Sequence, residues 1–206
     1  ISVGMDCGSA ACKGVLLREG AVVATCVKPT GWSPRETARS TLDELLEEAG
    51  VTRADAQVVA TGYGRVGIDF ADRAVTEITC HALGAEYPLP DARTVVDIGG
   101  QDSKVISVKN GKVMSFQMND KCAAGTGRFL EMSAHRMGVE LSDFPALLAA
   151  GKSCSLSSMC AVFADSEIVS LLASGKSREE VAGGIVQSVV ARAVALAARI
   201  EMEPPI

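Results

Sequence analysis

The feature that most constrains the fold is a short turn of acidic and glycine residues that occurs twice. The segment "MDCGS" places Asp6 near the end of an expected strand, and "VDIGGQD" places Asp97 at the corresponding point of a second strand. The order of elements around both turns begins as strand, turn, strand, turn, strand. This repetition predicts two α/β lobes with a ligand held in a cleft between them.

The remaining pattern fills in both lobes. In the first, three strands within residues 1–30 precede a helix that begins at Pro34 and ends at Gly50, a short strand in "AQVVATGYG" and a helix over residues 77–85. In the second, three strands from residue 94, with a hairpin turn at Asn110-Gly111, precede helices over residues 125–137, 142–150, 161–173 and 177–200. We expect lobes at residues 1–93 and 94–206, each β-β-β-α-β-α. The C-terminal part of the second is expected to be missing, because the chain opens on Ile1 and stops just after a helical pattern.

Composition excludes several classes of protein. The chain has 206 residues, 48% of them hydrophobic, which is enough to build a core. Its 20 Lys and Arg against 25 Asp and Glu give a net charge of −5, which argues against nucleic acid or an anionic membrane as the main partner. Arg192 and Arg199 interrupt the most apolar stretch, so no membrane span is expected. Seven cysteines without a signal peptide indicate a reducing compartment, in which disulfides explain them poorly.

Both turns have the features that binding a nucleoside triphosphate requires. Binding phosphate needs backbone N–H groups at close range and an acid for Mg²⁺. Asp6 and Lys13 accompany the first turn, and Asp97 begins the second. Gln101 is suited to orienting an attacking water, and Asp102 is a candidate general base or metal partner. Either turn alone would be an ordinary hairpin turn. Their pairing at equivalent positions favours the nucleotide, and the chain lacks a P-loop pattern.

Two cysteines are expected at helix starts. Cys122 and Cys160 each precede a helical pattern, and the N-terminus of a helix stabilises thiolates and anionic iron–sulfur clusters. Their separation is too long for a ferredoxin or zinc-ribbon motif, so no four-cysteine site is visible in one chain. A symmetric dimer would supply four thiolates to one 4Fe-4S cluster. The alternative is two small packing residues. Cys154 is either a third thiol of the site or part of a flexible loop, and the "TGYGR" segment ending at Arg65 is either a phosphate or partner contact or a plain turn.

Five segments together resemble one protein family. They are "GMDCGSAACKGVLL", "ATGYGR", "VVDIGGQDSKVI", "FQMNDKCAAGTGRFLE" and "CAVFADSEIVSLL". In this order they are similar to the activator component of 2-hydroxyacyl-CoA dehydratases, in the family that also holds the ATP-binding subunits of benzoyl-CoA reductase. The run "NDKCAAGTGRF" is the most specific of them, because helix capping alone would not produce it.

The resemblance implies an α/β acetate-and-sugar-kinase/actin-like ATPase fold and a homodimer. One 4Fe-4S cluster per homodimer would be bridged by Cys122 and Cys160 of both subunits, and each chain would bind ATP or ADP with Mg²⁺. The implied phosphate-binding residues are Ser9, Ala10, Ala11, Cys12 and Lys13 in the first turn and Asp97, Gly99, Gly100 and Gln101 in the second. The implied catalytic residues are Asp6, Gln101 and Asp102, with Asp6 and Asp97 serving Mg²⁺.

The resemblance also implies an activity. Members of the family accept an electron from reduced ferredoxin or flavodoxin and, driven by ATP, pass it to a partner dehydratase (component D), so we expect a cytoplasmic protein of anaerobic metabolism. Two departures stand out: Ala10 and Cys12 replace residues that often carry hydroxyls, and the adenosine-side "GGVA" motif is expected beyond Ile206. The alternatives are a benzoyl-CoA reductase subunit, a sugar or acetate kinase that uses Asp102 as base, and a regulatory ATP-binding module without a cluster.

Overall fold

The computed structural model describes residues 1–157 and 160–206, which form two compact units, Ile1–Pro88 and Leu89–Ile206. The sequence places the boundary slightly later, between residues 93 and 94. Arg93 belongs with the second unit because its N–H donates to Pro205 O at 2.9 Å and its carbonyl accepts from Val108 N at 2.8 Å.

The first unit contains one sheet and two α-helices. Its elements are β1 (Ser2–Cys7), β2 (Ala11–Arg18), β3 (Ala21–Pro29), α1 (Pro34–Ala49), η1 (Arg53–Asp55), β4 (Gln57–Thr61), η2 (Tyr63–Gly67), β5 (Arg73–Ala74) and α2 (Glu77–Ala85). The strand order is β3-β2-β1-β4-β5, with β1 parallel to β4 and antiparallel to β2. These elements match the predicted order, except that the two-residue strand β5 was not predicted.

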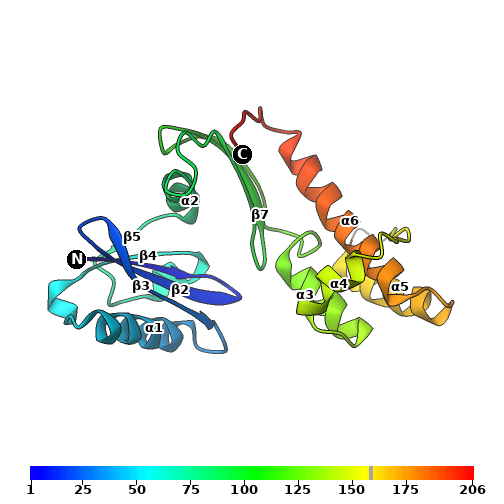
Figure 1. Ribbon diagram of the computed structural model, residues 1–206, viewed down its shortest axis with the longest axis horizontal. Coiled ribbons are helices and arrows are strands. Elements are labelled where there is room, and N and C mark those ends of the chain that lie inside the picture. Colours follow the sequence, from blue (N-terminus) through cyan, green and yellow to red (C-terminus); the bar gives the residue numbers. More distant parts are fainter. Residues whose placement is uncertain (158–159) are drawn as a thin grey trace. The chain divides into compact units, whose positions relative to one another are not determined.

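Helix α1 covers one face of this sheet (Figure 1). Alternation along β1 buries Val3, Met5 and Cys7, and Leu42 and Leu45 of α1 pack into the same core. Gly14 of β2 permits the close approach, since a Cβ there would lie 2.5 Å from Leu45 Cδ1. The sheet and α1 together hold the end of β1, where the first acidic turn begins.

The second unit has three strands followed by helices. Its elements are β6 (Thr94–Ile98), β7 (Ser103–Lys109), β8 (Lys112–Asn119), α3 (Gly127–Met137), η3 (Leu141–Asp143), α4 (Phe144–Leu148), α5 (Ala161–Ala173) and α6 (Arg178–Ala197). The strands form an antiparallel sheet in the order β6-β7-β8. Asn110 (φ 52°) and Gly111 (φ 66°) are both left-handed, as the predicted hairpin turn requires. No later strand occurs in the part of this unit that the structure describes.

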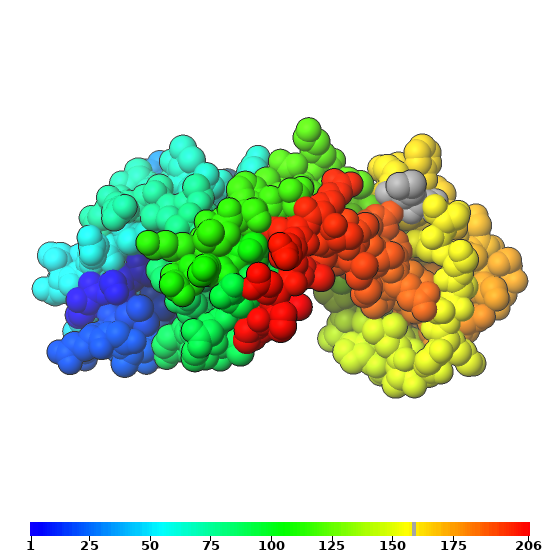
Figure 2. Space-filling view, turned by 90° about the horizontal axis from the view of Figure 1, so that it is seen from above, coloured from blue at the N-terminus to red at the C-terminus, as the bar shows by residue number. Residues whose placement is uncertain are grey.

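Helix α6 and the C-terminal residues close this unit. The C-terminal residues lie against the strand region in Figure 2, where Thr94 Oγ1 donates to Glu203 O at 2.9 Å. By length and composition, and contrary to the sequence expectation, α6 is apolar enough to span a membrane. However, Val181 and Ile185 are fully buried in a core shared with α3 and α5, which is typical of the core helix of a folded unit.

Candidate functional site

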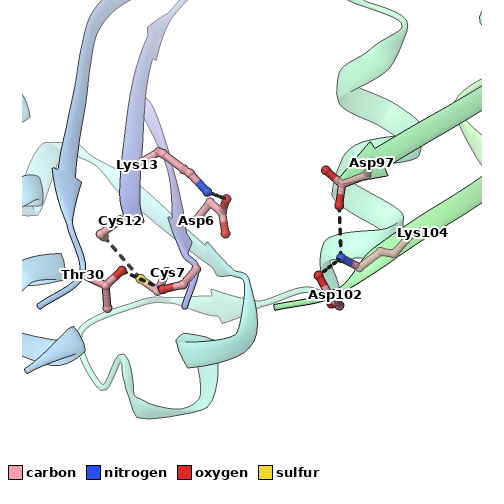
Figure 3. A network of polar contacts seen from close by, with 9 residues as sticks. Asp6, Cys7, Cys12, Lys13, Thr30, Asp97, Asp102 and Lys104 are labelled. Atoms are coloured by element: carbon pink, nitrogen blue, oxygen red, sulfur yellow. Dashed lines mark hydrogen bonds and ion pairs between the residues drawn. The ribbon is translucent and has the colours of Figure 1, made fainter. Parts of the chain in front are cut away.

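The first acidic turn joins β1 to β2. Gly8 N donates to Ala11 O at 3.1 Å and closes the turn, while the strand register places Asp6 opposite Lys13. Lys13 Nζ lies 2.8 Å from Asp6 Oδ2 (Figure 3). The acid and the cation predicted for this turn therefore meet across the hairpin.

The carbonyls of this turn are bonded, whereas two of its N–H groups are open. Thr30 Oγ1 donates to Gly8 O at 2.7 Å, and Thr30 N donates to Ala10 O at 2.9 Å. Within the described residues, neither the Ser9 nor the Ala10 N–H has a hydrogen-bond partner, and neither residue is buried. Two adjacent open N–H groups beside a lysine are the kind of donors that an anion-binding site uses.

The prediction for Cys12 is corrected by its burial. The alternation of β2 turns the Cys12 side chain into the core, where it is fully buried and its Sγ lies 3.7 Å from Cys7 Sγ. The side chain therefore cannot reach a phosphate on the outside of the turn. Ala11 contributes the carbonyl that closes the turn, so the groups of this turn that remain available to a phosphate are the two open N–H groups and the lysine.

The turn of the "TGYGR" segment packs against the first acid. Gly62 has φ 85° and ψ 178°, and a Cβ there would lie 2.3 Å from Asp6 Oδ1 and 2.7 Å from the Cys7 carbonyl oxygen. Thr61, opposite Asp6 in the register, has a buried hydroxyl without a partner among the described residues. Arg65 donates to Gly62 O at 2.9 Å and so closes its own turn. The segment therefore positions Asp6.

The second acidic turn joins β6 to β7 with the same closure. Gly99 N donates to Asp102 O at 2.8 Å, and the register places Asp97 opposite Lys104. Lys104 Nζ lies 3.2 Å from Asp97 Oδ2 and 2.8 Å from Asp102 Oδ1 (Figure 3). Its side chain is only 2% exposed, so a buried ammonium is compensated by two carboxylates.

Sequence reasoning missed Lys104, although the spacing signals it. Lys13 follows Asp6 by seven residues, and Lys104 follows Asp97 by seven. Each lysine also lies opposite its acid in the strand register. The two turns are therefore the same structural device and differ in burial, because the Lys13 side chain is 48% exposed.

The second turn also presents open N–H groups. Gly100 and Gln101, at the positions equivalent to Ser9 and Ala10, have N–H groups without a hydrogen-bond partner in the residues that the structure describes. Gln101 is exposed, as a side chain that meets a phosphate or water must be. Gly99 accommodates the tight turn, since a Cβ there would lie 2.8 Å from Asp102 Oδ1.

Helix α3 begins directly on the second turn. Gly127 N donates to Gly99 O at 2.8 Å, and Arg128 N donates to Gly100 O at 3.0 Å. The first N–H groups of a helix lack partners within the helix, so these two bonds satisfy them. The turn and the start of α3 are therefore one hydrogen-bonded assembly.

Cys122 lies in the loop ahead of α3, which corrects its predicted place at a helix N-terminus. The N-cap of α3 is Thr126, whose N–H and Oγ1 both bond to Ala123 O, at 3.1 and 2.6 Å. This tight turn occupies the residues between Cys122 and the helix. Asn119 Nδ2 donates to Cys122 O at 3.1 Å and holds the loop to the end of β8.

Cys160 is the N-cap of α5, as predicted, and its carbonyl accepts from Ala164 N at 2.9 Å. Arg136 of α3 connects the two helices, because its guanidinium bonds both carboxylate oxygens of Asp165 on α5, at 2.6 and 2.5 Å. This bond raises the pKa of Arg136. The elements that follow the two candidate ligands are thus joined by a bidentate ion pair.

Cys154 packs against α6 instead of standing open. Its N–H donates to Glu180 O at 2.9 Å, and its carbonyl lies where a Cβ on Gly184 would fall, 2.3 Å away. Burial raises the pKa of the Cys154 thiol, which disfavours the thiolate that a metal requires. The predicted flexible loop from here to Cys160 includes residues 158–159, which lie outside the described residues.

Cys122 and Cys160 are the candidate cluster ligands in the part of the chain that the structure describes. No group of three or more His, Cys, Asp or Glu side chains that could hold a metal gathers anywhere in residues 1–157 and 160–206. Cys122 and Cys160 are both partly exposed, so one chain offers two thiols of the kind that iron–sulfur clusters use. A cluster with four thiolate ligands would need two thiols in addition to these.

Comparison with known proteins gives consistent matches over almost the whole chain. A model of the BadF/BadG/BcrA/BcrD ATPase family matches residues 3–206. The (R)-2-hydroxyglutaryl-CoA dehydratase activating ATPase of Acidaminococcus fermentans is 44% identical over 97% of this chain and 78% of its own length. A subunit of the benzoyl-CoA reductase of Thauera aromatica is 33% identical over 93% of this chain and 71% of its own length.

Solved structures agree with the sequence matches. The crystal structure of component A of the A. fermentans dehydratase superposes with a TM-score of 0.93, covering 98% of this chain and 80% of that one. The activator of 2-hydroxyisocaproyl-CoA dehydratase from Clostridium difficile, solved with bound ADPNP, has a TM-score of 0.92 at 40% identity and covers 99% and 77%. The predicted actin-like ATPase fold is confirmed, and the chain spans about four fifths of these relatives.

Proposed function

We propose that this chain, which belongs to the BadF/BadG/BcrA/BcrD ATPase family, is an ATP-driven electron-transfer activator of a 2-hydroxyacyl-CoA dehydratase. It is an ATPase of the family of dehydratase activators, as its full-length similarity to several of them indicates. The details of nucleotide, cluster, donor and partner that follow are our proposal.

The two acidic turns hold the nucleotide phosphates. ADPNP bound to the 40% identical relative supports nucleotide binding here. In the first turn, the N–H groups of Ser9 and Ala10 and the Lys13 ammonium contact phosphate oxygens, and Asp6 serves Mg²⁺. Their exposure and open hydrogen-bonding capacity support these roles.

The second turn supplies the hydrolytic groups. The N–H groups of Gly100 and Gln101 contact phosphate, and the exposed Gln101 amide orients the attacking water. Asp97 serves Mg²⁺. Asp102 keeps one carboxylate oxygen beyond the atom that Lys104 binds, so it can accept a proton or bind a metal-bound water.

Cys122 and Cys160 bind a 4Fe-4S cluster across a homodimer. Each chain has two partly exposed thiols, and both adjoin helices that pack in the core of the second unit, which supports this assignment. When bound, the cluster supplies a one-electron redox centre. Reduced ferredoxin or flavodoxin is the proposed donor and a dehydratase component the acceptor, in the cytoplasm of an anaerobic cell.

The observation that carries the proposal is the hydrogen-bonded path from the second turn to the cysteine loop. The carbonyl oxygens of Gly99 and Gly100 accept hydrogen bonds from the first two N–H groups of α3. Cys122 lies in the loop that leads into that helix. A change of the turn on binding or losing the γ-phosphate must therefore shift the start of α3. Such a shift moves the loop that carries the ligand, which links ATP to the cluster.

The test is the iron and acid-labile sulfide content of protein purified without oxygen. We expect about four iron atoms per two chains, and loss of that iron in Cys122→Ala. Cys80→Ala, which removes a thiol on α2, is the matched control and is expected to retain the iron. A folded dimer without iron, or one that keeps iron without Cys122, would contradict the proposal.

Membership of a benzoyl-CoA reductase is the second candidate, because the T. aromatica relative is 33% identical. Both candidates predict iron, so they differ in the acceptor. A stable complex with a reductase partner would favour the second, whereas transient, ATP-dependent activation of a separate dehydratase would favour the first. A sugar or acetate kinase predicts neither iron nor activation, and it would phosphorylate a hydroxyl substrate.

A further inference from the structure

A pair of buried thiols beneath the first turn has no part in the proposed function. Cys7 and Cys12 face each other in the β1–β2 register, and their sulfur atoms are 3.7 Å apart. Figure 3 shows the two side chains pointing toward one another beside Thr30. Because Gly8 N bonds Ala11 O in the next pair, Cys7 and Cys12 occupy a non-hydrogen-bonded pair, where Cα atoms lie about 4.5 Å apart.

This geometry is within reach of a disulfide. Disulfides span Cα separations of about 4.4–6.8 Å and need an S–S distance of about 2.05 Å. The sulfur atoms must therefore approach by about 1.7 Å from their separation of 3.7 Å, which side-chain rotation can supply. By contrast, the buried Cys26 thiol donates to Glu44 Oε1 at 3.3 Å and has a carboxylate as its partner.

We propose that Cys7 and Cys12 are a modification site that hydrogen peroxide converts to an intramolecular disulfide. One of the two thiols gives up its proton and its sulfur attacks one peroxide oxygen, the O–O bond breaks, and the leaving hydroxide takes that proton to become water. The sulfur of the other cysteine then attacks this sulfenic sulfur and expels hydroxide, which takes the proton of the second thiol and leaves as a second water. Two thiols are oxidised, one peroxide is reduced, and a dithiol reductant reverses the change.

The bridge would also constrain the phosphate turn. It closes a ring over residues 7–12, which contains the open N–H groups of Ser9 and Ala10. The oxidised protein is therefore expected to lose affinity for ADPNP, a consequence that rests on the proposed function. ADPNP binding by the reduced protein tests that function separately, since weak binding there would count against the proposed function and not against the disulfide.

The experiment counts alkylated thiols in one peptide. Trypsin releases a peptide that ends at Lys13 and carries Cys7 and Cys12 as its two cysteines. Full-length protein is treated with peroxide, quenched with catalase, denatured so that buried thiols react, alkylated and digested. We expect two labels without peroxide, none after peroxide, and two again after reduction. Two labels after peroxide, or a loss that reduction does not reverse, would overturn the proposal.

Two variants identify the bonding partners. In Cys12→Ala, Cys7 should keep its label after peroxide, and its loss there would contradict an intramolecular bridge. Cys26→Ala removes another buried thiol of the same unit and should leave the wild-type pattern unchanged. If Cys12→Ala does not fold, the reversible loss of both labels in the wild-type peptide still decides the matter.

Discussion

At the residue scale, two lysines at equivalent positions differ in what their removal costs. Lys104 is 2% exposed and compensates Asp97 and Asp102, whereas Lys13 is 48% exposed beside Asp6. Lys104→Met leaves two partly buried carboxylates without their cation, and we expect a loss of about 1–3 kcal/mol in the free energy of unfolding. Lys13→Met should change it by about 0.5 kcal/mol at most. Urea denaturation measures the free energy of unfolding of both variants, and equal losses would contradict the greater cost that we expect at the buried lysine.

Asp72 makes the stability of the first unit depend on acid. Its carboxylate accepts from Val58 N at 2.6 Å and pairs with Arg53 at 3.0 Å, and these bonds lower its pKa below the ordinary value of 3.8. The stabilisation is therefore complete above that value and is lost as pH falls through the lowered pKa. Asp72→Asn should be less stable than the wild type at pH 7, and the difference should narrow as the pH falls below the ordinary pKa of 3.8. A difference in melting temperature that does not narrow would contradict this account.

At the element scale, the "TGYGR" turn depends on one glycine more than on another. Gly62 has a positive φ and no room for a Cβ, because Asp6 Oδ1 would lie 2.3 Å away, whereas nothing lies within 4 Å of a Cβ on Gly67. Gly62→Ala should cost about 1–3 kcal/mol in stability and weaken ADPNP binding by displacing Asp6. Gly67→Ala, at the other end of η2, should change either property little. Isothermal titration and urea denaturation check the pair, and similar behaviour of both variants would argue against this role of the turn.

Local sequence signals predicted most elements but not their exact ends. Helix α5 has its predicted bounds, Ala161–Ala173, because its N-cap residue comes directly before the helical apolar pattern in the sequence. Helix α3 begins later than predicted, since Thr126, the residue before its first turn, folds back on Ala123 O. Helix α4 is reduced to Phe144–Leu148, because a preceding capped turn, η3, uses the residues before it.

The candidate site shows the same limit. The acids and glycines of both turns could be predicted, because turn chemistry is local. The burial of Cys12 and the double role of Lys104 depend on strand register and on which side of each strand faces the core. The type of a single residue does not reveal its strand register or the side of the strand that it occupies. The repeated seven-residue spacing from acid to lysine does indicate the pairing of Lys104 with Asp97.

At the scale of the whole molecule, the proposed function requires that nucleotide binding change the cluster. We expect ADPNP to shift the reduction potential and the EPR signal of the cluster, through the bonds between Gly99, Gly100 and the start of α3. We expect Arg136 to transmit that movement to α5, because its guanidinium forms a bidentate pair with Asp165.

Arg136→Gln should therefore reduce the ADPNP-dependent shift while the protein keeps its iron, because the pair is partly exposed and contributes little to stability. Arg128→Gln is the matched control, since in the part of the chain that the structure describes the Arg128 side chain pairs with Glu131 of the same helix. Redox titrations followed by EPR, with and without ADPNP, compare the three proteins. An unchanged cluster in the wild type would refute the coupling, and equal shifts in both variants would show that the movement reaches the cluster without the link between α3 and α5.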